Sequence, residues 1–169
     1  MMELMQWKDR SSLRRAVVGA AVALALLTAA IWTTIDKRKL PTMQLETPNG
    51  TIVVEVADTP ARRSAGFSNR RGLSGVDGLL LKWDVPGRHP IWMAEMQFAL
   101  DLAWLDPDGR VVAVLANVPP CRADPCPLYE PDGTEASLAV LEMPAGTTSR
   151  HRIGVAATLR QSRHTRETR

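Results

Sequence analysis

"LDLAWLDPDGRVVAVLANV", residues 100–118, is the stretch that best indicates how this chain folds. Apolar residues alternate with others before a central "DPDG", and a second run rich in valine follows it. Alternation with a period of two is typical of a β-strand, and Asp, Pro and Gly supply the backbone angles of a tight turn. The stretch therefore predicts a β-hairpin in which Leu100, Leu102 and Trp104 share one face.

Strand signals recur on both sides of this hairpin. The segment "MQLETPNGTIVVEVA" at 43–57 predicts a second hairpin, because Asn-Gly is a strong turn signal. Further short strands are predicted at 78–83, 89–94, 137–143 and 155–160. Many short strands with regular turns favour a small barrel or a folded sheet.

Two segments predict short helices instead. In "DTPARRSAGF", residues 58–67, Thr59 fits the N-cap, Pro60 fits the first helical position, and Gly66 fits the end. Residues 144–154 predict one further helical turn. The expected fold is mainly β, a small barrel-like or folded antiparallel sheet with one or two short helices, preceded by a single N-terminal transmembrane helix.

The N-terminal part of the chain has the composition of a membrane anchor. Residues 16–35 carry no charge, and twenty apolar residues are about the length that crosses a bilayer. The alternative is a signal peptide cleaved after Ala30, with Thr28 at the −3 position. Basic residues flank both ends, and a small excess before the helix favours a cytoplasmic N-terminus.

These features predict five parts of the chain. They are a cytoplasmic segment 1–15, a transmembrane helix 16–35, a linker 36–42, a β domain 43–160 and a flexible tail 161–169. The domain would lie on the periplasmic or extracellular side of the inner (cytoplasmic) membrane. Small residues recur four apart along the helix, which is a pattern for close helix packing: Gly19, Ala21, Ala23, Ala25 and Ala29.

The charge distribution argues against nucleic acid as a partner. The whole chain has a net charge of +3, but residues 41–160 hold eleven Lys or Arg against fourteen Asp or Glu. A nucleic-acid-binding domain would carry a basic patch on the domain itself. One local basic cluster, Arg62, Arg63, Arg70 and Arg71, is either a solvated face or a contact for anionic lipid or an acidic partner.

Five segments in a fixed order resemble one known family. They are "VEVADTPARRSAGF", "SNRRGLSGVDGLLLKWDVPGRHPIWM", "LDLAWLDPDGRVV", "PPCRADPCPLY" and "AVLEMPAGTTSRHRIGV", within residues 53–159. The pattern resembles the family called domain of unknown function 192, or uncharacterised ACR. That resemblance implies a compact, mainly β domain, often exported, with no settled activity. Here "WM" is followed by Ala94, Glu95 and Met96 rather than the family's usual polar triplet.

The two cysteines of the chain, Cys121 and Cys126, enclose four residues. In an exported domain thiols become disulfides, so we expect a local disulfide that orders its own loop. Free thiols, a metal clip and a redox pair are the alternatives. Only His89, His151 and His164 could add imidazole ligands, and we expect no metal and no cofactor.

No catalytic motif stands out in the sequence. Asp106 and Asp108 fit a hairpin turn better than a carboxylate pair, and we expect Trp83, Trp92 and Trp104 in the core. We therefore expect a protein that is not an enzyme. The leading hypothesis is a structural or accessory subunit of an integral membrane complex, in contact with lipid and with membrane protein partners. The alternative is a periplasmic module that binds a small ligand in a pocket of Arg88, Trp92 and Glu95.

Overall fold

The computed structural model describes residues 15, 17, 18, 20, 21, 40–133 and 136–162. The chain divides into two units, residues 1–39 and residues 40–169. The elements of the second unit are β1 (Thr42–Thr47), β2 (Gly50–Ala57), α2 (Pro60–Ala65), β3 (Gly78–Gly87), β4 (Ile91–Trp92), β5 (Leu100–Leu105), β6 (Val111–Val118), β7 (Leu128–Tyr129), β8 (Ser137–Pro144), α3 (Thr147–His151) and β9 (Arg160–Gln161).

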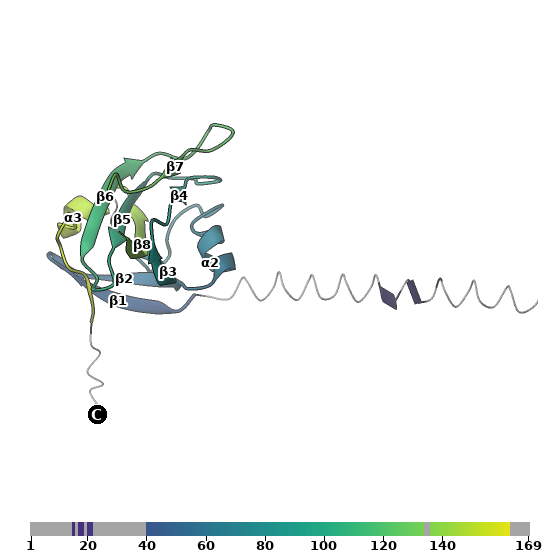
Figure 1. Cartoon of the computed structure of the whole chain (residues 1–169), viewed down its shortest axis with the longest axis horizontal. Helices are drawn as coiled ribbons and strands as arrows, with labels where there is room; N and C mark the ends of the chain where they lie inside the picture. Colours follow the sequence, from purple (N-terminus) through teal and green to yellow (C-terminus); the bar gives the residue numbers. More distant parts are fainter. Residues whose placement is uncertain (1–14, 16, 19, 22–39, 134–135, 163–169) are drawn as a thin grey trace, which may run out of the picture. The chain divides into compact units, whose positions relative to one another are not determined.

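Seven of the strands form one sheet in the order β6-β5-β8-β3-β2-β1-β9, and β4 and β7 form a separate small sheet. The large sheet curls on itself, with α2 on one side and α3 on the other in the view of Figure 1. Both predicted hairpins are confirmed, because β1 pairs with β2 and β5 pairs with β6, each antiparallel. The mainly β fold with two short helices is likewise confirmed.

The expectation of an antiparallel sheet is wrong at one pair of strands. Strands β2 and β3 run parallel, with Val54 opposite Gly78 and Ala57 opposite Leu81. A parallel neighbour requires a crossover rather than a tight turn, and residues 58–77, which contain α2, make that crossover. The predicted last strand also differs: of residues 155–160 only Arg160 belongs to β9, which pairs with β1.

Both faces of the curled sheet are buried. Leu100, Leu102 and Trp104 of β5 lie together in one apolar cluster, as their alternation predicts. Ala103 and Leu105, which alternate with them, lie in a second cluster. Strand β8 contributes to both clusters in the same way, so its residues at alternate positions face two different cores.

Most of the predicted transmembrane helix lies outside the described residues. Of positions 16–35 the structure describes only 17, 18, 20 and 21, all in helical conformation, and Ala21 is exposed. Gly19, Ala23, Ala25 and Ala29 are not described. Within the described ranges, no helix has the length and apolar character that crossing a membrane requires.

Candidate functional site

A cavity of about 360 Å³ lies in the β domain beside α2. Its walls are mostly apolar and aromatic, and they come from α2, the turn after it, β3, β4, β7 and β8. The lining residues are Pro60, Arg63, Ser64, Ala65, Gly66, Phe67, Ser68, Leu81, Trp83, Pro90, Ile91, Trp92, Met96, Leu128 and Glu142. A volume of this order accommodates a small organic molecule.

Glu142 is the one carboxyl among these lining residues. It stands on β8 between Leu79 of β3 and Leu102 of β5, both fully buried. Glu142 itself is only 4% exposed, and its Oε2 atom has no hydrogen-bond partner among the described residues. A buried polar atom without a partner is rare in folded proteins. Removing it from water costs hydration free energy, and no hydrogen bond within the protein compensates for that loss.

Burial changes the protonation of this carboxyl. It raises the pKa of Glu142 to about 8, and the positive charge of Arg70 opposes the shift. Arg70 does not pair with Glu142; its Nη1 lies 2.6 Å from Oε2 of Glu55. The Glu142 side chain is therefore mainly neutral at pH 7, an O–H donor facing a largely apolar space.

The contrast with Asp101 shows that Glu142 is exceptional. Asp101 lies on the neighbouring strand β5 and is also fully buried. Its Oδ2 accepts hydrogen bonds from the backbone N and Oγ1 of Thr148, at 2.9 and 2.7 Å, and its Oδ1 accepts one from the backbone N of Asn117 at 2.9 Å. Asp101 thus holds the start of α3 and the end of β6 in place, which is a structural role.

Helix α2 covers the carboxyl of Glu142 with its C-terminal end. The helix begins where predicted, since the Thr59 side chain accepts a hydrogen bond from the backbone N of Arg62. It ends at Gly66, whose φ is +47°. A Cβ atom at Gly66 would lie 3.5 Å from Oε2 of Glu142, an ordinary van der Waals distance, so the end of α2 lies next to the carboxyl, and it is the positive φ that favours glycine here.

One wall of the cavity is built around Trp83. The guanidinium of Arg63 lies 5.1 Å from the Trp83 ring centroid, and the His89 ring stacks on Trp83 at 3.9 Å. Nη1 of Arg63 donates to the backbone carbonyls of Asp58 and Lys82, at 2.9 and 2.8 Å. Burial lowers the pKa of His89, so this histidine remains mainly neutral at pH 7. Trp83 is thus in contact with both side chains, and the one charge of this wall comes from Arg63.

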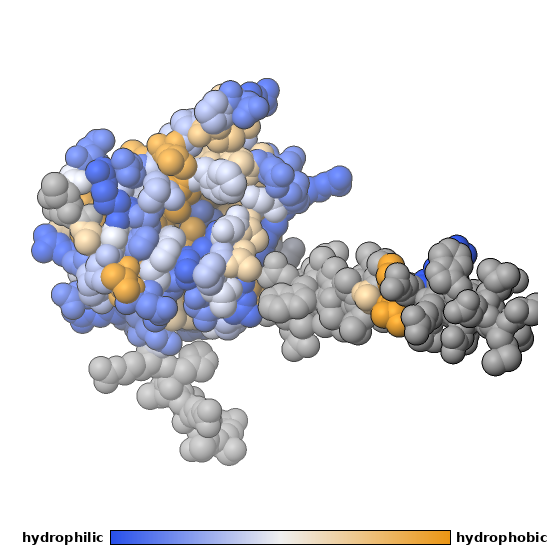
Figure 2. Space-filling model, turned by 45° about the vertical axis from the view of Figure 1, so that its right-hand side comes forward, coloured by the Kyte–Doolittle hydropathy of each residue, from blue (hydrophilic) through white to orange (hydrophobic). Residues whose placement is uncertain are grey.

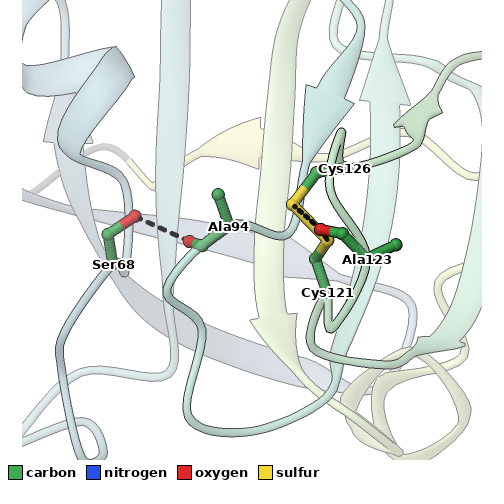
Figure 3. Close-up of a disulfide and its surroundings, with 5 residues drawn as sticks. All are labelled: Ser68, Ala94, Cys121, Ala123 and Cys126. Carbon is green, nitrogen blue, oxygen red and sulfur yellow. Dashed lines mark hydrogen bonds between the residues drawn. A yellow bond between two sulfur atoms is a disulfide. The ribbon is translucent and has the colours of Figure 1, made fainter.

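A second cavity, of about 480 Å³, shares Ser64, Ala65, Ser68 and Trp92 with the first and adds Asn69, Ala94 and Glu95. The turn after α2 is tied to the loop after β4 at this point. Oγ of Ser68 donates to the carbonyl of Ala94 at 3.1 Å (Figure 3). The backbone N and Nδ2 of Asn69 donate to O and Oε2 of Glu95, at 2.9 and 2.7 Å. These bonds fix the rim that the two cavities share.

The structure places two of the three predicted pocket residues at these cavities. Trp92 lines both, and Glu95 lines the second. Arg88 lines neither; it lies 3.2 Å from Glu130 and donates to the carbonyl of Pro131 at 3.1 Å. The expectation that Trp92 belongs to the core is wrong, since the residue is 52% exposed, whereas Trp104 is fully buried and Trp83 is half-buried.

The predicted arginine cluster is divided among separate contacts. Arg62 pairs with Asp58 at 2.8 Å, Arg70 pairs with Glu55, and Arg63 lies over Trp83. Arg71 is exposed. Three of the four side chains thus have partners inside the domain, and their contact with lipid or an acidic partner stays a prediction.

Cys121 and Cys126 lie at disulfide distance, with sulfur atoms 2.19 Å apart and Cα atoms 5.8 Å apart (Figure 3). Cys121 is tied to the cavity region by a backbone hydrogen bond of 2.9 Å to the carbonyl of Met93. Over the described parts of the chain, no three His, Cys, Asp or Glu side chains come together as a group suited to a metal ion.

Sequence reasoning missed Glu142. In "SLAVLEM", residues 137–143, alternation places Glu142 on the same face as the buried Val140. A charged residue at a core position of an apolar strand is the signal that would have identified it.

The comparisons with known proteins agree with this fold. A family model described as Uncharacterized ACR, domain of unknown function 192, matches residues 43–161. A protein described as a candidate transcription regulator from Sinorhizobium meliloti 1021 is 22% identical, with a TM-score of 0.65 over 74% of this chain and 97% of that one. A protein of unknown function from Novosphingobium aromaticivorans DSM 12444 is 25% identical, with a TM-score of 0.63 over 72% and 86%. No curated protein matches the chain.

Proposed function

The chain belongs to the domain of unknown function 192 family, and from its own geometry we propose that the β domain is a small-ligand binding module. The site is the cavity at Glu142. The observation that carries this proposal is the buried Oε2 atom of Glu142, which has no partner among the described residues and belongs to a side chain that lines an aromatic cavity. Enclosed apolar cavities with a few polar groups are the usual form of a ligand site.

The cost of burying Glu142 supports this proposal. An apolar residue at the same position would pack between Leu79 and Leu102 without losing hydration free energy. An ionisable residue buried without a partner is expected at a functional site, where a bound molecule supplies the missing interaction. Binding is favoured over catalysis, because the cavity lining offers one carboxyl and one guanidinium and no second acid or base.

We further propose that the domain is exported and works on the periplasmic or extracellular side of the inner membrane. The cysteine pair at disulfide distance supports this location, since disulfides persist in oxidising compartments. A reporter that is active only in the periplasm, fused after Arg169, should give a signal. A reporter active only in the cytoplasm should give none, and a strong signal from it would overturn the location.

One observation favours a second function, the predicted structural or accessory subunit of a membrane complex. Trp92 of β4 and Leu128 of β7 are paired across the small sheet and are 52% and 64% exposed. Figure 2 shows a few strongly apolar residues on a face of the domain that is otherwise largely hydrophilic. Exposed apolar side chains suit contact with a partner. The same two residues also line the cavity, so they fit the first function equally well.

Ligand-observed NMR with a library of small fragments tests the binding function. The full-length protein would be placed in lipid nanodiscs, with empty nanodiscs to correct for partitioning into lipid. Ser64 is an exposed residue of α2 that lines both cavities, so Ser64→Trp should fill them and abolish the fragment signals. Ser149→Trp, on the exposed side of α3, is the matched control and should leave the signals unchanged. Fragments that bind the Ser64→Trp variant as well as the parent would refute the site.

A further inference from the structure

The charges around the cavity leave one group uncompensated. Arg62 is paired with Asp58, and Arg70 is paired with Glu55. Arg63 donates to two backbone carbonyls and covers Trp83. Glu142, by contrast, forms no ion pair with any residue that the structure describes, and its Oε2 atom makes no hydrogen bond there. Among the described residues, Glu142 is therefore the one buried cavity group without a partner, and a cation would pair with its carboxylate once the proton is displaced.

The aromatic rings of the lining point to the same chemistry. Phe67 and Trp83 each already have an arginine over the ring, with Arg70 at 5.3 Å and Arg63 at 5.1 Å from the ring centroids. Trp92 has no cation over its ring within the described part of the chain, and it is half-exposed. An indole face is the strongest side-chain binder of organic cations. Trp92 is thus a vacant aromatic surface on the cavity that Glu142 lines.

We propose that this cavity binds a small organic ammonium ion, with its charge on the Glu142 carboxylate and its apolar body against Trp92, Ile91 and Met96. This inference rests on the proposed ligand-binding function and names the ligand class of that site. The apolar part would contact Ile91 and Met96, which line the cavity and are largely buried. An ammonium group would supply the N–H donors that Oε2 lacks, and a short alkyl chain would fit a volume of about 360 Å³.

Binding of a cation must then displace the proton of Glu142. The charged groups on α2, on the turn after it and on strands β3 and β5, which pack around this carboxyl, are Arg62, Arg63, Arg70, Lys82, Asp84 and Asp101. Of these, Arg70 is the one whose charge shifts the pKa of Glu142, and it lowers that pKa. Because burial raises the pKa of Glu142 to about 8, few molecules carry the ionised carboxylate at pH 6. Affinity for an alkylammonium ion, which stays protonated from pH 6 to 8, should therefore increase roughly ten-fold per pH unit from pH 6 toward the pKa of Glu142.

Three probes of equal length separate the possible ligand classes: n-butylammonium as cation, n-butanol as neutral molecule and butyrate as anion. Each would be titrated by saturation-transfer NMR onto the full-length protein in nanodiscs, with empty nanodiscs as the blank. We expect n-butylammonium to bind at least about ten-fold more tightly than the other two at pH 8. Glu142→Gln keeps the shape and removes the charge, so it should eliminate this preference. Trp92→Leu should weaken the ammonium about ten-fold, and Trp92→Phe should restore part of the loss.

The outcomes distinguish this inference from the function on which it rests. Suppose that n-butanol or butyrate binds as tightly as n-butylammonium and that Ser64→Trp still abolishes binding. The cavity is then a ligand site, but the assignment of its ligand as an ammonium ion is wrong. The assignment is also overturned if n-butylammonium binds the Glu142→Gln variant as tightly as the parent. It is overturned as well if the affinity of the parent for n-butylammonium does not rise between pH 6 and 8. If none of the three probes binds, the assignment is overturned, and the fragment library alone decides the binding function.

Discussion

The carboxyl of Glu142 lies next to Gly66, where an added Cβ atom would be in van der Waals contact with Oε2 at 3.5 Å. These residues are far apart in the sequence, and their contact joins the end of α2 to the C-terminal half of β8. The helix thereby shields the carboxyl from water, which is the cause of its unusual titration.

The backbone at Gly66 gives the first prediction. Gly66→Ala should lower the free energy of unfolding by about 1–3 kcal/mol, because φ of +47° with ψ of −133° is strained for any residue with a Cβ atom. Chemical denaturation would measure the change. Gly72→Ala is the control, since no atom lies within 4 Å of its added Cβ, and it should change stability by less than about 0.5 kcal/mol. Equal effects of the two substitutions would contradict the prediction.

The titration of Glu142 gives the second prediction, on stability and pH. The carboxyl is protonated in the folded state up to about pH 8, but in the unfolded chain it loses its proton near the ordinary glutamate pKa of 4.5. The unfolded state therefore binds fewer protons between these values, and stability must fall as the pH rises through that window, by up to about 1.4 kcal/mol per unit.

The matched variant for this effect is Glu142→Gln, which does not titrate. Denaturation curves from pH 5 to 9 should show a steep loss of stability for the parent and a smaller one for the variant, with little further difference between them above pH 8. Parallel curves for the two proteins would show that Glu142 titrates normally.

Asp101 gives the third prediction. Asp101→Asn should destabilise the domain by about 2–3 kcal/mol, because an amide cannot accept all the hydrogen bonds that now come from Thr148 and Asn117. Thr148→Ser keeps the hydroxyl donor and should cost less. Thermal unfolding of the three proteins would rank them, and a neutral effect of Asp101→Asn would exclude the structural role.

The cysteine pair gives the fourth prediction. Changing both Cys121 and Cys126 to Ser should cost at most about 2 kcal/mol, since the loop that they close is short. An unreduced digest of the parent should contain the loop with both residues joined. Complete alkylation of the two thiols without reductant would disprove the bond.

Much of the fold was predictable because its signals are local. The hairpin at 100–118, the Thr59 cap and the end of α2 at Gly66 each follow from a few neighbouring residues. The parallel pairing of β2 and β3 was not predictable in this way, because residues 58–77 separate the strands and only tertiary packing fixes their direction.

The site was harder to predict than the fold for the same reason. Trp92 and Glu95 were identified near a pocket, but Arg88 lies elsewhere, since His89 adopts a left-handed backbone (φ 47°) that changes the direction of the chain between them. Glu142 belongs to a strand about fifty residues away, and the curling of the sheet brings it to Trp92 and α2. Its single sequence signal, a charged residue within an apolar strand, is clear only in retrospect.

The most direct test is a measurement of the pKa of Glu142 itself. The protein would be labelled with ¹³C at glutamate side-chain carboxyls, the Glu142 resonance assigned by its absence from the Glu142→Gln variant, and its shift followed from pH 4 to 10. We expect a midpoint near 8 for the free protein and a midpoint at least about one unit lower with saturating n-butylammonium, because a bound cation stabilises the carboxylate. A midpoint near 4.5 in the free protein would mean that the carboxyl is hydrated or paired, and it would contradict the assignment of this cavity as a ligand site.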